Sequence, residues 1–500
     1  MTAAPTPSAI VVGGSVAGLA AALFLARQGV TVTVLDHDAA VGSVPIDAAQ
    51  AEVRRSTPQA AHSHIFLSRL RLLLAERAPD VLEELRAAGA HEIAMADGRP
   101  DPLVSAHLPR GDELVALAVR RSVFEAAVRG AVLRQDGVAL VAGTSVTGLR
   151  YGPAAADGTP VVVGVDLEDG TALEADVVID ASGRRTSLPG WLAEVGVEPP
   201  TEVVDCGISY VSRFYERRPG ATPPRLTRGF TTGSSFDRYS CLVFPGEGRT
   251  FSVTFGILPE DRELRGLTDG TAFEAAVSAI PSMAWWVQPH NAVPISDAKA
   301  MNGLKNRMRR YVVDGRPLVL GLAAVGDAAS TTNPAHSRGT TLAFVHAAAV
   351  ADAVVAAAGD RTALALAVDA AVERDLQPWF DDSIAQDALR LSRWRPAGEH
   401  EAPVPVEGTL ANGEAAGAAQ LDPEVWARFA RLQNLLETPD EVLADPALVA
   451  AVRRVQASGL RAPGAEAPSH DELAALVAAT RAPKGPRVPE ASRRLVAQAS

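Results

Sequence analysis

The chain has 500 residues, of which 47% are hydrophobic, so it can bury one very large core or two to three joined ones. Its formal net charge of -12 and the lack of a long basic run disfavour a nucleic-acid partner. The two cysteines, Cys206 and Cys241, form no Cys-x-x-Cys pair, which argues against a disulfide framework and favours a reducing, cytoplasmic setting.

The first predicted unit spans residues 10–38, with the sequence IVVGGSVAGLAAALFLARQGVTVTVLDHD. Aliphatic and β-branched residues predict strands at 10–12 and 31–35, and the alanine-rich segment 16–28 predicts a helix between them. The uncharged run 10–26 approaches the length of a membrane span. Its glycines and the missing basic flank favour a strand and helix buried in a sheet instead, with no integral membrane span.

Later segments continue this alternation of strands and helices. The pattern predicts helices at 67–88, 121–134 and 340–358, strands at 138–149, 161–168, 175–180 and 318–325, and a hairpin turn at Asp169-Gly170. Between about residues 200 and 300 longer β-type runs predict an inserted antiparallel sheet. The helical texture of the remaining chain contains a Pro-, Gly-, Ala- and Glu-rich stretch at 396–420, which predicts a linker.

Two patterns in the last hundred residues predict helices. The first is a set of apolar residues that share one helical face: Val425, Phe429, Leu432 and Leu436. The second is Ser469 and Glu472, which are spaced like a capping box. The predicted domains are therefore a discontinuous nucleotide-binding domain at 8–199 and 301–360, an inserted β-rich domain at 200–300, and a helical C-terminal region at 361–500.

The first unit carries a dinucleotide-binding pattern. The G-x-G-x-x-G fingerprint is spelled with Gly13, Ser15 and Gly18, so only its middle glycine is replaced. The Ser15 hydroxyl could donate to a phosphate oxygen, and Asp36, 23 residues after Gly13, is placed to accept the hydroxyls of an adenosine ribose. The predicted cofactor residues of this unit are Gly13, Gly14, Ser15, Ala17, Gly18 and Asp36.

Two further motifs distinguish FAD from NAD. Together with the first unit, ADVVIDASGRRTSLPGWL (175–192) and GLAAVGDAASTTNPAHSRGTTLA (321–343) resemble, in the same order, the FAD-dependent monooxygenases related to para-hydroxybenzoate hydroxylase. RRSTPQAAHSH (54–64) adds a likeness to the branch that tailors polyketides and terpenoids. The resemblance implies a Rossmann-type FAD-binding domain of the glutathione-reductase type, an inserted antiparallel-sheet substrate domain and a helical C-terminal tail.

The resemblance also implies a reaction. Reduced flavin would react with oxygen to form a C4a-peroxide, whose distal oxygen is inserted into an electron-rich apolar small molecule by hydroxylation or epoxidation. Arg54 and Arg121 are expected at the cofactor, and no catalytic residue is assigned. A dehydrogenase or reductase on the same fold and a non-catalytic flavin-binding protein remain as alternatives. A flavin halogenase is disfavoured, because the first lysine is Lys299 and AWWVQPH (284–290) is not the W-x-W-x-I-P stretch.

The third motif has a physical interpretation of its own. A strand that ends in Gly326-Asp327 sets a carboxylate where it can accept a hydrogen bond from the ribityl chain of a flavin. Pro334 lacks an N–H and packs flat. The first N–H groups of the following helix, from Gly339, Thr340 and Thr341, would face the pyrimidine oxygen and stabilise the reduced ring.

Three positions depart from the family or stay open. Ser182-Gly183 replaces the usual Asp-Gly pair, so a separate NAD(P)H-dependent flavin reductase is expected to supply electrons. Arg338 lies where the family has glutamine; a place near the flavin and a solvated surface position are equally favoured. His62 and His64 lack a third metal ligand, so no metal is predicted and a loop facing flavin or substrate is favoured.

Overall fold

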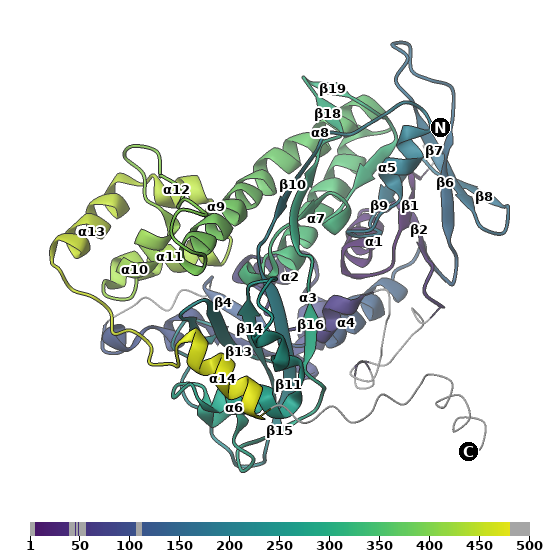
Figure 1. The fold of residues 1–500 in the computed structure, drawn as a ribbon. Coiled ribbons are helices and arrows are strands. Elements are labelled where there is room, and N and C mark those ends of the chain that lie inside the picture. Colours follow the sequence, from purple (N-terminus) through teal and green to yellow (C-terminus); the bar gives the residue numbers. More distant parts are fainter. Residues whose placement is uncertain (1–5, 40–45, 47–48, 50–56, 107–112, 481–500) are drawn as a thin grey trace, which may run out of the picture.

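The computed structural model describes residues 6–39, 46, 49, 57–106 and 113–480 (Figure 1). Its central element is a five-stranded sheet in the order β20-β9-β1-β2-β5, in which all neighbours are parallel. The strands are β1 (Ser8–Val12), β2 (Thr31–Asp36), β5 (Val138–Ala142), β9 (Val177–Asp180) and β20 (Leu322–Ala324). Parallel strands present all their carboxyl ends at one edge, where ligands of open α/β sheets bind.

Three helices pack over this sheet and share its core: α1 (Val16–Arg27), α4 (Arg121–Leu133) and α7 (Gly339–Ala357). The Phe344 ring meets those of Phe24 and Phe124 edge-on, at centroid distances of 6.1 and 5.4 Å. Burying each ring contributes about 1.5 to 3 kcal/mol. The predicted βαβ unit is confirmed.

Helix α7 is long and apolar enough to cross a membrane, judged by length and composition alone. However, 72% of its apolar window is buried inside the protein, and its closest helical partner is α1. The helix therefore accounts for its own hydrophobicity by packing in the core.

Two predicted elements are wrong in extent. The strand predicted at 138–149 is two strands, β5 and β6 (Val146–Tyr151), because Gly143 turns the chain with a φ of +70°. The helix predicted at 67–88 is two helices, α2 (Ser68–Arg77) and α3 (Pro79–Ala87). Pro79 forces the break, since proline disfavours helical geometry at the preceding residue and lacks the N–H that would continue the ladder.

The predicted inserted sheet is present, and all its pairings are antiparallel. Its order is β12-β13-β14-β11-β15, with β16 also beside β11. The strands are β11 (Ser209–Arg217), β12 (Thr232–Ser235), β13 (Tyr239–Pro245), β14 (Thr250–Ile257), β15 (Ala292–Pro294) and β16 (Lys299–Met301). Helix α6 (Gly270–Ser278) and Trp286 join this sheet in one hydrophobic core.

Smaller sheets connect the two large ones. β10 (Thr201–Asp205), β17 (Lys305–Arg309) and β21 (Ser330–Thr331) form one, and β6, β7 (Val162–Leu167) and β8 (Ala172–Glu174) form another. The predicted turn at Asp169-Gly170 joins β7 to β8, and the Asp169 carboxylate accepts the Thr171 N–H. The remaining described elements are β3 (His91–Ala94), β4 (Val115–Ala118), β18 (Val312–Val313), β19 (Arg316–Pro317) and α5 (Leu188–Ala193).

The C-terminal region is helical, as predicted. It contains α8 (Arg361–Asp375), α9 (Gln377–Trp394), α10 (Asn412–Ala418), α11 (Pro423–Gln433), α12 (Pro439–Leu443), α13 (Pro446–Ala457) and α14 (His470–Thr480). Helices α10 to α13 gather near one end of α9, away from the parallel sheet, whereas α14 returns to lie beside α6 (Figure 1). The predicted linker at 396–420 includes α10, whose Ala415 is fully buried, and Leu436 lies beyond the end of α11.

Candidate functional site

The three sequence motifs meet at the carboxyl edge of the parallel sheet. Each motif follows a strand of that sheet, and backbone hydrogen bonds tie the strand ends together. These bonds are Gly13 N to Leu35 O at 2.7 Å, Ala181 N to Val12 O at 2.8 Å, and Val325 N to Asp180 O at 2.8 Å. Segments separated by more than 300 residues in sequence therefore build one site.

The fingerprint glycines are required by close backbone packing. Gly13 has a φ of +108°, and a Cβ there would lie 2.6 Å from the Ala181 carbonyl oxygen of the second motif. A Cβ on Gly18 would lie 1.8 Å from the Gly13 carbonyl oxygen. Side chains at either position would push α1 away from the sheet edge.

Ser15 precedes α1 and has a different partner from the predicted phosphate. Its hydroxyl donates to Glu125 Oε2 at 2.9 Å and lies 3.3 Å from an Arg121 guanidinium nitrogen. The hydroxyl proton is therefore used within the protein, and a phosphate would be met by the free N–H groups of the first turn of α1. Arg121 is buried beside this loop.

Asp36 ends β2 with a carboxylate that is 4% exposed. One oxygen accepts the Gly14 N–H at 2.7 Å, and the other accepts the Asp38 N–H at 2.8 Å. Both oxygens are thereby fixed in orientation, and each keeps a lone pair for a further donor. This arrangement suits the predicted role of Asp36 toward a ribose.

The first and third motifs touch through small residues. Gly326 has a φ of +59°, and a Cβ there would lie 2.6 Å from the Ala17 Cβ. The next residue, Asp327, is a half-buried carboxyl whose pKa is raised by burial, while Arg121, Arg184 and Arg307 oppose that shift. The carboxyl of the third motif thus faces three arginines from separate parts of the chain.

The start of α7 contains groups that fit a flavin. Gly339 is exposed, lacks a positive φ, and a Cβ there would meet no atom within 4 Å. Glycine is therefore not demanded by the protein itself, which suits close approach of a ligand. Thr340 and Thr341 are buried, Pro334 is exposed, and the Thr341 hydroxyl has no partner among the described residues. In that same part of the chain, no side chain caps α7.

Arg338 adopts neither of the two predicted environments. The side chain is 3% exposed, forms an ion pair with Asp382, and lies 4.9 Å above the Trp379 ring centroid. Both partners belong to α9, so the guanidinium is held against that helix and is not solvated. Arg54, the other predicted cofactor arginine, lies outside the described residues.

The segment with His62 and His64 joins the cofactor edge to the inserted sheet. His62 Nδ1 lies 3.1 Å from Ser212 Oγ on β11, and His64 Nδ1 lies 2.9 Å from the His62 carbonyl oxygen. Burial lowers the pKa of His62 to about 4, with help from Lys299 and Arg184. It also lowers the pKa of His64 to about 3, with help from Arg121. Both imidazoles are therefore neutral near pH 7.

Sequence reasoning missed several of these charged residues. Arg184 lies in the second motif and could have been noticed there, but Arg307 belongs to β17 and has no sequence signal. Glu125 follows Phe124 in a pair noted for the neighbouring arginine, yet its contact with Ser15 bridges 110 residues. Such partners are set by tertiary packing.

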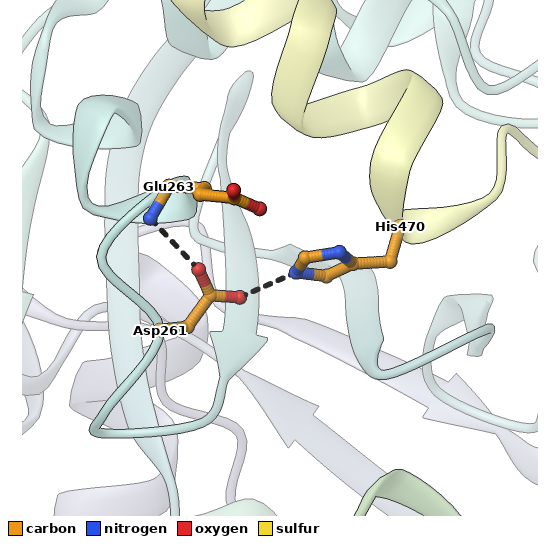
Figure 2. Close-up of side chains that lie close together, drawn as sticks. All are labelled: Asp261, Glu263 and His470. Carbon is orange, nitrogen blue, oxygen red and sulfur yellow. Dashed lines mark hydrogen bonds and ion pairs between the residues drawn. The ribbon is translucent and has the colours of Figure 1, made fainter.

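A separate polar cluster docks the last described helix. His470, Asp261 and Glu263 present ligand-type atoms within 4.8 Å of one another (Figure 2). His470 Nε2 lies 2.7 Å from Asp261 Oδ2, and its Nδ1 lies 3.0 Å from Asp471 Oδ1. Both ring nitrogens thus donate to carboxylates, which describes an imidazolium ion pair and leaves no lone pair for a metal.

This ion pair predicts a pH-dependent attachment of α14. Burial alone would lower the pKa of His470, but hydrogen bonds to Asp471 and Asp261 raise it above its usual value, despite the nearby Arg238. The stabilisation is complete below the unfolded pKa of about 6.5 and is lost as the pH rises through the folded value. Hydrogen-exchange protection of residues 470–480, corrected for intrinsic rates, should fall over that range. In His470→Gln protection should be lower and independent of pH; equal profiles would contradict the ion pair.

Comparisons with known proteins agree with this site. A protein-family profile described as FAD dependent oxidoreductase matches residues 9–186. Protein Rv3254 of Mycobacterium tuberculosis (strain ATCC 25618 / H37Rv) is 28% identical over 469 residues, which cover 87% of this chain and 90% of that protein.

Solved structures share the fold at low identity. PqsL, a probable FAD-dependent monooxygenase from Pseudomonas aeruginosa, has a TM-score of 0.56 at 17% identity, covering 78% of this chain and 97% of its own. The p-nitrophenol 4-monooxygenase PnpA from Pseudomonas putida DLL-E4 has a TM-score of 0.56 at 14% identity, with coverages of 91% and 97%. The flavin-dependent brominase Bmp2 has a TM-score of 0.58 at 17% identity, with coverages of 91% and 100%. The family match and the shared fold identify the chain as an FAD-dependent oxidoreductase with the fold of the FAD-dependent monooxygenases.

Proposed function

We propose that this chain is a monooxygenase that inserts one oxygen atom, by hydroxylation or epoxidation, into an electron-rich apolar small molecule. The observation that supports this most is the segment that links the cofactor edge to the inserted sheet. Its His62 contacts Ser212 on β11, and its His64 lies close enough to Arg121 for the guanidinium to lower the imidazole pKa. A molecule bound against β11 would therefore lie near the predicted flavin position.

The chain's own residues divide the cofactor between them. Asp36 would accept the adenosine ribose hydroxyls, and the uncapped start of α1 would hold the pyrophosphate. The N–H groups of Gly339, Thr340 and Thr341 would face the ring, where the positive end of the α7 dipole favours negative charge. When bound and reduced, FAD supplies the electrons and the activation of oxygen.

The substrate side is formed by the inserted sheet. Apolar residues between 205 and 295 are proposed to choose the substrate, and a closed interface there would exclude water. The two cysteines, Cys206 and Cys241, are free and buried, which agrees with the proposed cytoplasmic setting.

The test of the proposed function is oxygen incorporation. Holoenzyme supplied with reductant, an electron-rich aromatic or polyene library and isotopically labelled oxygen should give a product that contains one labelled atom. Oxidation of the organic compound without label would favour the dehydrogenase or reductase. Stable FAD binding without turnover would favour the non-catalytic flavoprotein.

The source of electrons gives a second prediction. The Asp180 carboxylate does not substitute for the missing Asp of the Asp-Gly pair, because it accepts hydrogen bonds from Ser182 and Thr186 in its own loop. We therefore expect NADPH or NADH to bleach the flavin slowly in anaerobic, substrate-saturated enzyme, whereas dithionite bleaches it fully. Fast bleaching by either nicotinamide, stimulated by substrate, would remove the need for a separate reductase and leave the proposed oxygenation intact.

A further inference from the structure

The flavin-facing loop between Asn333 and Arg338 is anchored at both ends to one helix. The Asn333 side-chain amide donates to Asp387 Oδ1, and the Arg338 guanidinium pairs with Asp382. Asp382 and Asp387 belong to α9, a helix of the C-terminal region. With Trp379, they occupy one face of α9, because spacings of three, five and eight residues return to nearly the same side.

The Asn333 anchor belongs to a fully buried network. Asn306 Nδ2 donates to Asp387 Oδ2 at 2.8 Å, and the Asn333 backbone N–H donates to Asn306 Oδ1 at 2.8 Å. Ser383 of α9 donates to the same Asn306 oxygen at 2.9 Å. From the inserted sheet, the Tyr210 hydroxyl donates to Asn333 Oδ1 at 2.7 Å. The loop is thus bonded to α9, to β17 and to β11.

Asp387 is the hub of this network. It is 2% exposed, and burial raises its pKa, although Arg390 and the two asparagine amides oppose that shift. Arg390 Nη1 donates to Asp387 Oδ1 at 2.6 Å. If the carboxylate is lost, the amides of Asn306 and Asn333 are left buried without their acceptor, which is the costly way to break such a network.

The loop also needs external support. Ser337 has a φ of +55°, a left-handed conformation that a residue with a side chain adopts only where its surroundings enforce it. Ser337 lies between the two anchors and directly before Arg338 and Gly339. Hence any change at the anchors alters the start of α7.

We propose that Asp387 is a positioning residue, which sets the N–H groups of Gly339, Thr340 and Thr341 against the flavin by fixing Asn333. The inference rests on the proposed placement of the flavin at the start of α7. It gives the C-terminal region a role in cofactor chemistry, through a helix that itself lies behind the loop.

The test compares two buried carboxylates in the holoenzyme. Asp387→Asn should lower the midpoint potential of bound FAD, because the reduced anionic ring loses aligned donors, and should raise the FAD dissociation constant about tenfold. Asp375→Asn is the matched control, since Asp375 is equally buried and pairs with Arg69 at 2.7 Å, yet touches no residue of the loop. It should lower thermal stability similarly and leave the potential unchanged.

Two further variants separate positioning from folding. If Asp387→Asn folds poorly, Tyr210→Phe removes a single donor to Asn333 and should shift the potential less, in the same direction. Combining Asn333→Asp with Asp387→Asn reverses the amide and the carboxylate, and should restore the potential toward that of the wild type. Equal potentials in Asp387→Asn and the wild type, or equal shifts in Asp375→Asn, would overturn the inference. A wild-type protein that binds no FAD would instead refute the proposed function.

Discussion

Replacing Gly18 with alanine should prevent formation of the dinucleotide site. The new Cβ would lie 1.8 Å from the Gly13 carbonyl oxygen, a backbone atom that cannot move without opening the contact between α1 and the sheet. The free energy of unfolding should fall by at least about 3 kcal/mol, and purified protein should contain little FAD. Thermal unfolding and the flavin-to-protein absorbance ratio measure both effects.

The control for this substitution is Gly190→Ala. Gly190 lies within α5, lacks a positive φ, and a Cβ there would meet no atom within 4 Å. Alanine should be neutral or slightly stabilising at this position, because it restricts the unfolded chain. If Gly18→Ala were as stable and as yellow as Gly190→Ala, the close packing of α1 on the loop would be disproved.

Replacing Asp36 with alanine should strongly reduce FAD affinity without unfolding the protein. Alanine removes a charge-assisted acceptor for the ribose worth about 1.5 to 3 kcal/mol per hydrogen bond, and it also frees the Gly14 N–H that Asp36 now holds. The FAD dissociation constant should rise by about 10- to 150-fold. Equilibrium binding of FAD to the apoprotein, followed by flavin fluorescence, gives this value.

Asp36→Asn is the graded comparison. Asparagine keeps one acceptor oxygen but loses the charge, so its affinity should lie between those of the wild type and Asp36→Ala. An unchanged dissociation constant in Asp36→Ala would place the ribose elsewhere. Stoichiometric binding of NAD without flavin would refute the cofactor assignment for the whole chain.

Local sequence signals were sufficient for the frame of the site. Gly13, Gly18 and the carboxylate at the end of β2 follow from short-range demands of a strand, a turn and a helix, so the pattern predicted them. Proline also marked a break that the helix prediction at 67–88 ignored, since Pro79 restricts Ala78 and lacks an N–H.

Long-range partners explain what could not be predicted. The hydroxyl of Ser15 was assigned to a phosphate because Glu125, its observed acceptor, is 110 residues away. Arg338 had two plausible environments in sequence, and Asp382 and Trp379 on a later helix created a third. The domain boundaries stay a prediction, because the hydrophobic cores join residues from across the chain.

The docking of α14 has a consequence for how the chain is made. Leu473, Ala474 and Val477 belong to the same hydrophobic core as the inserted sheet, whose first strand begins at Ser209. During vectorial synthesis, this sheet therefore waits with an open apolar face until nearly the whole polypeptide has left the ribosome. Throughout that interval the face is available to chaperones and to other nascent chains, so the step most exposed to aggregation comes late in translation.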